Sequence, residues 1–212
     1  MKMTMNEIYF ERKQFFNDHA EEWLDKWYKD PETGRYDKYD SQFERLFSLL
    51  PLKPGDRVLD AGCGSGVLVP FILDRITPTG ILYELDFSAK MIDTNQCLHP
   101  SENIRFMVSD VENAPLADAS FDGVICFSCF PHFHDKENAL RALSRTLKPE
   151  GVFVVSHFSS SEEINRHHES CHAVMHDHLP DAASMRTMFQ NARLTIEAFI
   201  DEPGFYCIIA NK

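Results

Sequence analysis

The sequence predicts an α/β fold in which a doubly wound sheet ends in an antiparallel hairpin. Apolar strand segments alternate with helical segments between residues 57 and 157, which is typical of a parallel sheet with helices on both faces. A Gly-rich turn at 62–66 follows the first of these strands. Near the end of the chain, strands at 194–200 and 205–210 flank a short turn that contains Pro and Gly.

Composition and charge indicate one cytoplasmic domain. The 212 residues are 43% hydrophobic, which is enough for a sizeable core with a small appended cap. No apolar run approaches the ~20 residues of a membrane helix, and residues 1–12 lack the apolar core of a signal peptide. The net charge of −12 argues against binding to nucleic acid or to an anionic membrane surface. The six scattered cysteines are expected to be reduced thiols.

Residues 6–50 are expected to form two helices separated by a turn-rich break at 30–34. Apolar side chains recur three and four residues apart in both helices, and Pro51 ends the second. In one interpretation both helices pack on the sheet, and in the other they form a helical lid over a ligand site. The aromatic wall of such a lid would consist of Phe10, Phe15, Phe16, Trp23 and Tyr28.

The Gly-rich turn joins the first strand to a helix that is expected to begin at Gly66 and end near residue 76. Glycine lets the backbone approach a ligand closely, so a strand, a Gly-rich turn and a helix N-terminus predict a nucleotide-type site. The second strand, 81–85, is followed by Asp86, a carboxylate placed to bind two ribose hydroxyls. Glu84 is an alternative acid, which we expect to point to the opposite face of the strand.

The third, fourth and fifth strands are expected at 104–108, 123–127 and 152–157, with a helix at 136–147 before the last. The loop 128–135 follows the fourth strand at the carboxyl edge of the sheet, where parallel α/β sheets bind ligands. Cys126 is expected in the core and Cys129 in the lining of a pocket.

Asp60, Gly62, Gly64 and Gly66 form the pattern acid-x-Gly-x-Gly-x-Gly. This pattern resembles motif I of class I S-adenosylmethionine-dependent methyltransferases, and the resemblance extends over residues 45–212. It implies a Rossmann-like seven-stranded sheet with a terminal antiparallel hairpin and an α-helical N-terminal lid. It also implies transfer of a methyl group from S-adenosyl-L-methionine to a small molecule. The central motifs are similar to those of the quinone-biosynthesis type.

The resemblance assigns ten residues to cofactor binding. The amino-acid part would be held by the loop, the ribose by the end of the second strand, and the adenine by the segment after the third strand. Phe127, at the end of the fourth strand, adds a further contact. The expected cofactor residues are Asp60, Gly62, Cys63, Gly64, Gly66, Asp86, Phe87, Asp110, Val111 and Phe127.

Histidines are concentrated between 157 and 178, in a segment that the resemblance identifies as a lid insertion at 158–190. If one helix continues through this segment, His168, His172 and His176 share a face and, with His157, are suited to bind Zn²⁺, Ni²⁺, Fe²⁺ or Cu²⁺. Two alternatives are a solvated His-rich surface and general acid–base chemistry. For the latter, the expected catalytic residues are His168, Asn165 and His132, with His134 as an alternative base.

The sequence therefore predicts an N-terminal helical lid at 1–50 and a methyltransferase domain at 51–212, acting as a monomer or homodimer on a small-molecule substrate. The alternative from a different class is a metal-binding or metal-sensing protein on the same scaffold. A nicotinamide oxidoreductase is disfavoured by Asp60, by the glycine spacing and by the terminal hairpin. The acceptor atom and the base stay open.

Overall fold

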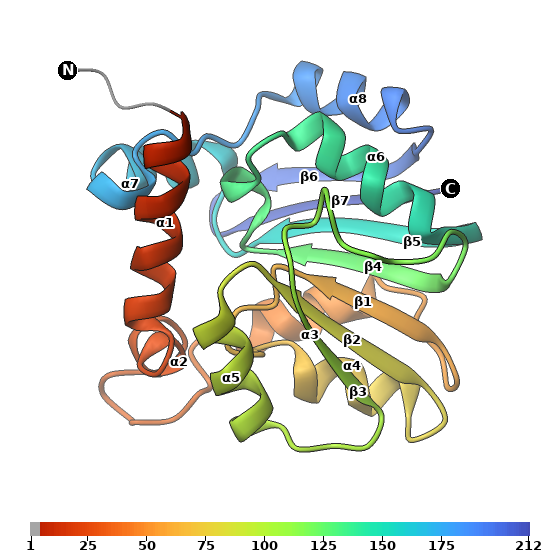
Figure 1. Ribbon diagram of the computed structural model, residues 1–212, viewed down its shortest axis with the longest axis horizontal. Helices are drawn as coiled ribbons and strands as arrows, with labels where there is room; N and C mark the ends of the chain where they lie inside the picture. Colours follow the sequence, from red (N-terminus) through yellow and green to blue (C-terminus); the bar gives the residue numbers. More distant parts are fainter. Residues whose placement is uncertain (1–4) are drawn as a thin grey trace.

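The computed structural model describes residues 5–212, and its seven strands form one mixed sheet in the order β3-β2-β1-β4-β5-β7-β6 (Figure 1). Strands β1 to β5 run parallel, whereas β7 is antiparallel to both β5 and β6. The predicted doubly wound sheet with a terminal hairpin is confirmed. The strands are β1 (Arg57–Ala61), β2 (Ile81–Asp86), β3 (Ile104–Val108), β4 (Phe121–Phe127), β5 (Leu147–His157), β6 (Thr195–Glu202) and β7 (Phe205–Asn211).

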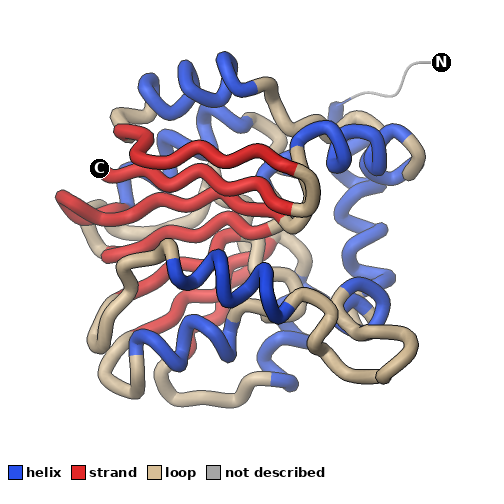
Figure 2. Tube along the Cα trace, turned by 180° about the vertical axis from the view of Figure 1, so that it is seen from behind, coloured by secondary structure: helices blue, strands red, loops and turns tan. Residues whose placement is uncertain are grey.

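Helices cover both faces of the sheet (Figures 1 and 2). On one face, α6 and α8 bury apolar side chains such as Leu140 and Phe189 against the strands. On the other, α3 and α4 bury Leu46 and Ile72. The helices are α1 (Met5–His19), α2 (Trp23–Trp27), α3 (Asp40–Ser48), α4 (Val69–Ile76), α5 (Ala89–Leu98), α6 (Lys136–Thr146), α7 (Ser161–Glu169) and α8 (Ala182–Asn191), with short 3-10 helices η1 (Phe130–His132) and η2 (His172–Val174).

Two helical differences and one strand boundary depart from the prediction. The N-terminal region contains three helices instead of two, because the first ends at His19. Helix α4 begins at Val69, three residues later than expected, because Gly66 has a φ of +86°, which no right-handed helix contains. Strand β5 begins at Leu147, so the expected turn before the fifth strand is part of the strand.

The N-terminal helices divide between the two interpretations. Helix α3 packs on the sheet, where Phe43 and Phe47 are buried in the core. Helix α1 instead stands across the edge at which the parallel strands end (Figure 1), where it contacts α5 and η2. The expectation for residues 1–12 falls partly on residues 1–4, which lie outside the described part of the chain. None of the helices within residues 5–212 is long and apolar enough to cross a membrane.

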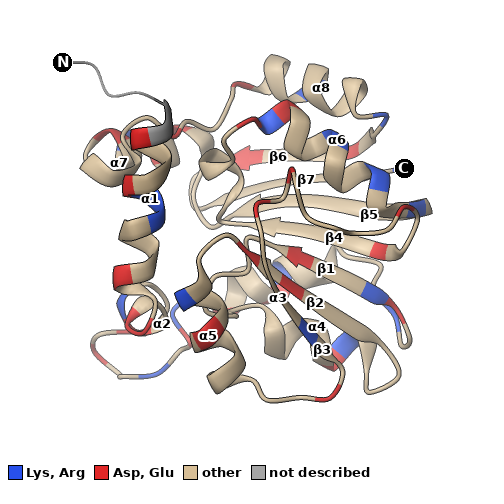
Figure 3. Cartoon of the chain, viewed as in Figure 1, with Lys and Arg blue, Asp and Glu red and all other residues tan. Residues whose placement is uncertain are grey.

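Charged residues of both signs are interspersed along the chain. Figure 3 shows positions of Lys and Arg among those of Asp and Glu along the ribbon. All six cysteines are free, as predicted. Cys126 is fully buried in β4, and Cys129 lies at the end of this strand with its thiol donating to the Ala61 carbonyl at 2.9 Å.

Glu84 does not point away from Asp86, because residues two apart on a strand share a face. Glu84 lies two residues before Asp86 in β2, and its carboxylate accepts a hydrogen bond from Asn95 Nδ2 at 2.6 Å. The side chain is fully buried, and burial raises its pKa to about 8. Glu84 is therefore a neutral core residue near pH 7.

Glu84→Gln is expected to increase stability at alkaline pH. The folded protein keeps this proton up to about pH 8, whereas the unfolded chain releases it near 4.5, so wild-type stability decreases as pH rises through this window. Glutamine has no proton to lose. We expect the free energy of unfolding at pH 9 to exceed that of the wild type by at least about 1 kcal/mol, or roughly 2–4 °C in Tm. Thermal unfolding between pH 5 and pH 9 measures this, with the exposed Glu102→Gln as control. Parallel wild-type and variant profiles would contradict the prediction.

Candidate functional site

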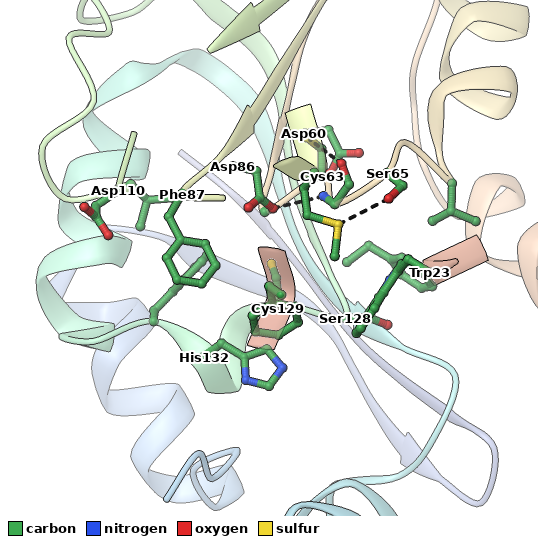
Figure 4. A pocket seen from close by; sticks show the side chains of 18 of the residues that line it. Trp23, Asp60, Cys63, Ser65, Asp86, Phe87, Asp110, Ser128, Cys129 and His132 are labelled. Carbon is green, nitrogen blue, oxygen red and sulfur yellow. Dashed lines mark hydrogen bonds between the residues drawn. The ribbon is translucent and has the colours of Figure 1, made fainter. Parts of the chain in front are cut away.

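A cavity with an empty volume of about 910 Å³ lies at the carboxyl edge of the sheet, between the strand ends and helices α1 and α2. Asp60, Cys63 and Asp86 lie on one side of it and His132 on the opposite side (Figure 4). Nine of the ten residues expected to bind the cofactor line this cavity. Gly66 is the exception.

The three glycines of the turn have different surroundings. All three have positive φ angles, which L side chains rarely adopt. A Cβ on Gly62 would lie 2.5 Å from Cys129 Cβ, and one on Gly66 would lie 2.2 Å from Asn95 Oδ1. A Cβ on Gly64 would meet no atom nearer than 3.9 Å. Gly62 and Gly66 therefore permit close packing of the turn, and Gly64 faces the open cavity.

Gly66→Ala and Gly64→Ala are expected to separate packing from ligand binding. The added methyl group at Gly66 forces Asn95 to move, in addition to the backbone strain, so we expect a loss of about 3 kcal/mol in stability. At Gly64 we expect only the backbone strain, about 1 kcal/mol. Its main effect should be weaker binding of the ligand that approaches the turn. Chemical denaturation and ligand titration of both variants measure these effects, and equal destabilisation would contradict the assignment.

Four carboxylates line the cavity, namely Asp60, Asp86, Asp110 and Glu112, and the first three differ in their hydrogen-bond partners. Both side-chain oxygens of Asp60 are buried without a hydrogen-bond partner among the described residues, and burial raises its pKa well above the usual value. Asp86 accepts hydrogen bonds from the backbone amides of Gly64 at 3.0 Å and Ser88 at 2.8 Å. Burial raises the pKa of Asp86 to about 6. Asp110 accepts from the Tyr9 hydroxyl at 2.8 Å.

Helix α1 covers this cavity through polar contacts and one apolar cluster. Tyr9 binds Asp110, Asn17 accepts from the Ser88 hydroxyl at 2.7 Å, and the Ala20 carbonyl accepts from the Ser65 hydroxyl at 2.8 Å. Phe16 packs with Ala20 and Met91. The prediction that Phe10 belongs to the aromatic wall is wrong, because this residue is 67% exposed. The other four aromatic residues line cavities.

A second cavity, with an empty volume of about 1380 Å³, adjoins the first. The two share six wall residues, namely Phe16, Trp23, Tyr28, Phe127, Ser128 and His132. The rest of its wall includes the aromatic residues Phe15, Trp27, Tyr39 and Phe158, and His157, His167 and His168 add imidazoles. A ligand in the second cavity would therefore face a ligand in the first across these shared side chains.

The side chain of His132 is hydrogen-bonded to the buried carboxylate of Asp177, which was not predicted as a site residue from the sequence. Its Nδ1 lies 2.7 Å from Asp177 Oδ2, and the other oxygen of Asp177 forms an ion pair with Arg12 of α1. Arg12 also donates to the His132 carbonyl at 2.6 Å. Burial lowers the pKa of His132, and the hydrogen bond with Asp177 only partly offsets this. His132 is therefore a neutral imidazole with a fixed orientation.

His168 and His157 also line the second cavity. His168 Nδ1 lies 2.5 Å from the backbone carbonyl of Asp177, and its ring centroid lies 5.0 Å from that of His132. Burial lowers the pKa of His168 to about 4 and that of His157 to about 3. His134, the alternative base, lines the first cavity beside Tyr9.

The predicted helical array of histidines does not form. Helix α7 ends at Glu169, so His172 and His176 leave the helix and are exposed. Within residues 5–212 no group of three or more His, Cys, Asp or Glu side chains is arranged to hold a metal ion. The predicted metal site at His157, His168, His172 and His176 is thus not supported, and the metal-sensing alternative loses its basis.

Asn165 has a different role from the expected one. Its amide donates to the Leu179 carbonyl at 3.1 Å and accepts from the Leu179 amide at 2.8 Å. It lines neither cavity. Asn165 therefore fixes the segment that carries Asp177 and lies outside the walls of both cavities. Arg12 is a further site residue that the sequence analysis missed. Its position on the same helical face as Tyr9 and Phe16 could have identified it.

Comparisons with known proteins agree with this geometry. Residues 59–155 match the family model described as a methyltransferase domain. The chain is 33% identical over 110 residues to the 2-phytyl-1,4-naphtoquinone methyltransferase of Trichormus variabilis, which covers 50% of this chain and 48% of that protein. It is 34% identical over 112 residues to a ubiquinone/menaquinone biosynthesis C-methyltransferase of Pseudomonas savastanoi, which covers 51% and 44%. The chain thus spans about half the length of these curated relatives.

Among solved structures, the fold is similar to a chain in the complex between the Haloferax volcanii Trm112 methyltransferase activator and the putative methyltransferase. The TM-score is 0.76 at 22% identity, and the match covers 92% of this chain and 96% of that chain. This likeness extends well beyond the matched segment of 59–155.

Proposed function

We propose that this chain, which has the fold and domain of a class I S-adenosylmethionine-dependent methyltransferase, transfers a methyl group from S-adenosylmethionine to a small molecule. The observation that carries the proposal is the pair of adjoining cavities that share the wall containing His132. The first cavity would bind the methyl donor and the second the acceptor. The methyl group would then pass from donor to acceptor at the junction that these shared residues line.

The residues of the first cavity fit S-adenosylmethionine. The two unpartnered oxygens of Asp60 are suited to the cationic end of its amino-acid part, since a buried carboxylate needs an opposite charge. Asp86 has lone pairs for the ribose hydroxyls beyond those used by its two backbone amides. Asp110 and Val111 line the same cavity and would contact the adenine. When bound, the molecule supplies an electrophilic methyl group on a sulfonium.

The chain's own contribution to such a transfer is mainly positioning. Two reactants held in alignment gain an effective molarity of about 10⁵–10⁸ M. Helix α1 excludes water from the first cavity through Tyr9 and Phe16. The aromatic walls of the second cavity favour a ring-shaped acceptor, and the names of the relatives, which are quinone methyltransferases, support a quinone-type or related aromatic acceptor.

Calorimetric titration of the purified chain tests the proposal. We expect S-adenosylmethionine and S-adenosylhomocysteine to bind with dissociation constants in the micromolar range. NADH serves as the contrasting ligand, because a Gly-rich turn also occurs in dinucleotide-binding domains. Tight binding of NADH, or no binding of either adenosyl compound, would overturn the proposed function.

A further inference from the structure

We propose that the second cavity takes a hydroxylated aromatic molecule, and that the ring hydroxyl facing His132 is the methyl acceptor, with His132 as its base. The inference rests on the proposed function and deepens it by naming the substrate class. It is drawn from the tautomers of two histidines, the position of one of them and the charge of the cavity.

The hydrogen-bond partners fix the tautomers of His132 and His168. Asp177 Oδ2 and the Asp177 carbonyl oxygen can only accept, so each Nδ1 carries the proton. Each Nε2 then holds a lone pair, and no described residue hydrogen-bonds either atom. The two rings lie 5.0 Å apart in the same cavity wall. The cavity therefore presents two neighbouring hydrogen-bond acceptors and is suited to a molecule with two neighbouring donors.

The position of His132 selects the acceptor atom. Its side chain lines both cavities, whereas those of His168 and His157 line the second cavity alone. A base at this junction removes a proton from the atom that lies nearest to the methyl donor. The deprotonated atom and the attacking atom are then the same, which favours methylation of the hydroxyl oxygen over methylation of a ring carbon.

The cavity is built for an uncharged aromatic ring. Its walls include Trp27, Tyr39 and Phe158, and aromatic side chains pack well against a flat ring. Its two charged wall residues are Lys26, which is exposed to solvent, and Glu163, whose carboxylate accepts from the Ser160 and Gly204 amides. Neither is available to neutralise a buried ionic ligand.

Asp177 and Arg12 position the base. The guanidinium and carboxylate are both buried, and the ion pair joins helix α1 to the segment between α7 and α8. Because Asp177 also binds His132, three segments distant in the sequence meet at this carboxylate. The base is fully oriented only when α1 lies over the first cavity, which links orientation of the base to exclusion of water.

The chemical step conserves atoms and electrons. The hydroxyl proton moves to Nε2 of His132, and the oxygen lone pair forms the new bond to the methyl carbon. The bond between that carbon and the sulfonium sulfur breaks, and its electron pair stays on sulfur as a neutral thioether. The products are an aryl methyl ether, S-adenosylhomocysteine and a protonated imidazole, which releases its proton to solvent.

Binding and turnover of catechol test this assignment. With S-adenosylhomocysteine bound, we expect calorimetry to show binding of catechol at least about 10-fold tighter than of its dimethoxy analogue, since the analogue leaves both imidazoles unpaired. With S-adenosylmethionine, mass spectrometry and NMR should identify an O-methyl product. His132→Gln should reduce the single-turnover rate at saturating catechol about 10²–10⁴-fold, which exceeds the roughly 10-fold loss of catechol affinity expected when one acceptor is removed.

The exposed His176→Gln is the matched control and should behave as the wild type. His168→Gln provides a second test, because it should weaken catechol binding about 10-fold and leave the affinity for S-adenosylmethionine unchanged. A C-methylated product, equal binding of the dimethoxy analogue, or full activity of His132→Gln would overturn the acceptor assignment while the proposed function stands. Failure to bind S-adenosylmethionine would instead overturn the proposed function itself.

Discussion

Replacement of Asp86 by alanine is expected to weaken S-adenosylmethionine binding about 100-fold or more. In the proposed complex the carboxylate binds two ribose hydroxyls, and each hydrogen bond to a charged group contributes about 1.5–3 kcal/mol. The same side chain accepts from the amides of Gly64 and Ser88, so its loss also releases the glycine turn. Calorimetric titration of the variant with S-adenosylmethionine and S-adenosylhomocysteine measures the effect.

Two comparisons make this prediction specific. Asp93→Ala, an exposed change on the neighbouring helix α5, should bind as the wild type does. The pKa of Asp86 is raised by burial to about 6, so a protonated carboxyl should bind the hydroxyls and amides less well below that pH. Wild-type affinity should therefore decrease as pH falls through about 6, and the pH dependence should be much weaker in Asp86→Ala. Wild-type affinity in Asp86→Ala would remove Asp86 from the cofactor site.

The cofactor side of the site was predictable from sequence because it is local. A strand, three glycines and a strand-end carboxylate lie within 57–86, and backbone conformation alone brings them to one edge of the sheet. The errors there concerned Gly66, which does not line the cavity and does not begin helix α4, and Glu84. The Glu84 side chain lies on the same face as Asp86 and is kept out of the cavity by its bond to Asn95.

The acceptor side was much less predictable because it depends on contacts between distant segments. His132 and Asp177 are 45 residues apart, and Arg12 and Asp177 are 165 apart. Helical periodicity led to an array of His168, His172 and His176, but the chain leaves the helix at Glu169. The residue in this segment that contacts His132 is Asp177, which lies between two exposed histidines. Helical periodicity does not distinguish this carboxylate from its neighbours.

Asp177→Asn is expected to reduce the rate of methyl transfer about 10²–10⁴-fold, provided that the acceptor is a hydroxyl as proposed. An asparagine amide can donate to Nδ1 of His132, which favours the tautomer with the proton on Nε2, and that tautomer is no base. The buried Arg12 also loses its counter-charge, so thermal unfolding of the variant is needed to correct the rate for any loss of folded protein. The exposed Asp74→Asn on α4 is the control.

The pH profile separates positioning of the base from a structural role. Burial lowers the pKa of His132, while the hydrogen bond and charge of Asp177 raise it, and the net pKa lies below that of a free histidine. The base works when neutral, so the wild-type rate should fall as pH decreases through this lowered pKa. Asp177→Asn removes the group that raises the pKa of His132. The charges of Arg12 and Lys136, which lower this pKa, stay in place, as do the neighbouring rings of His168 and His157. The acid limb of the variant should move to lower pH, whereas a carboxylate that only holds the fold together would change the amount of active protein and leave this limb in place.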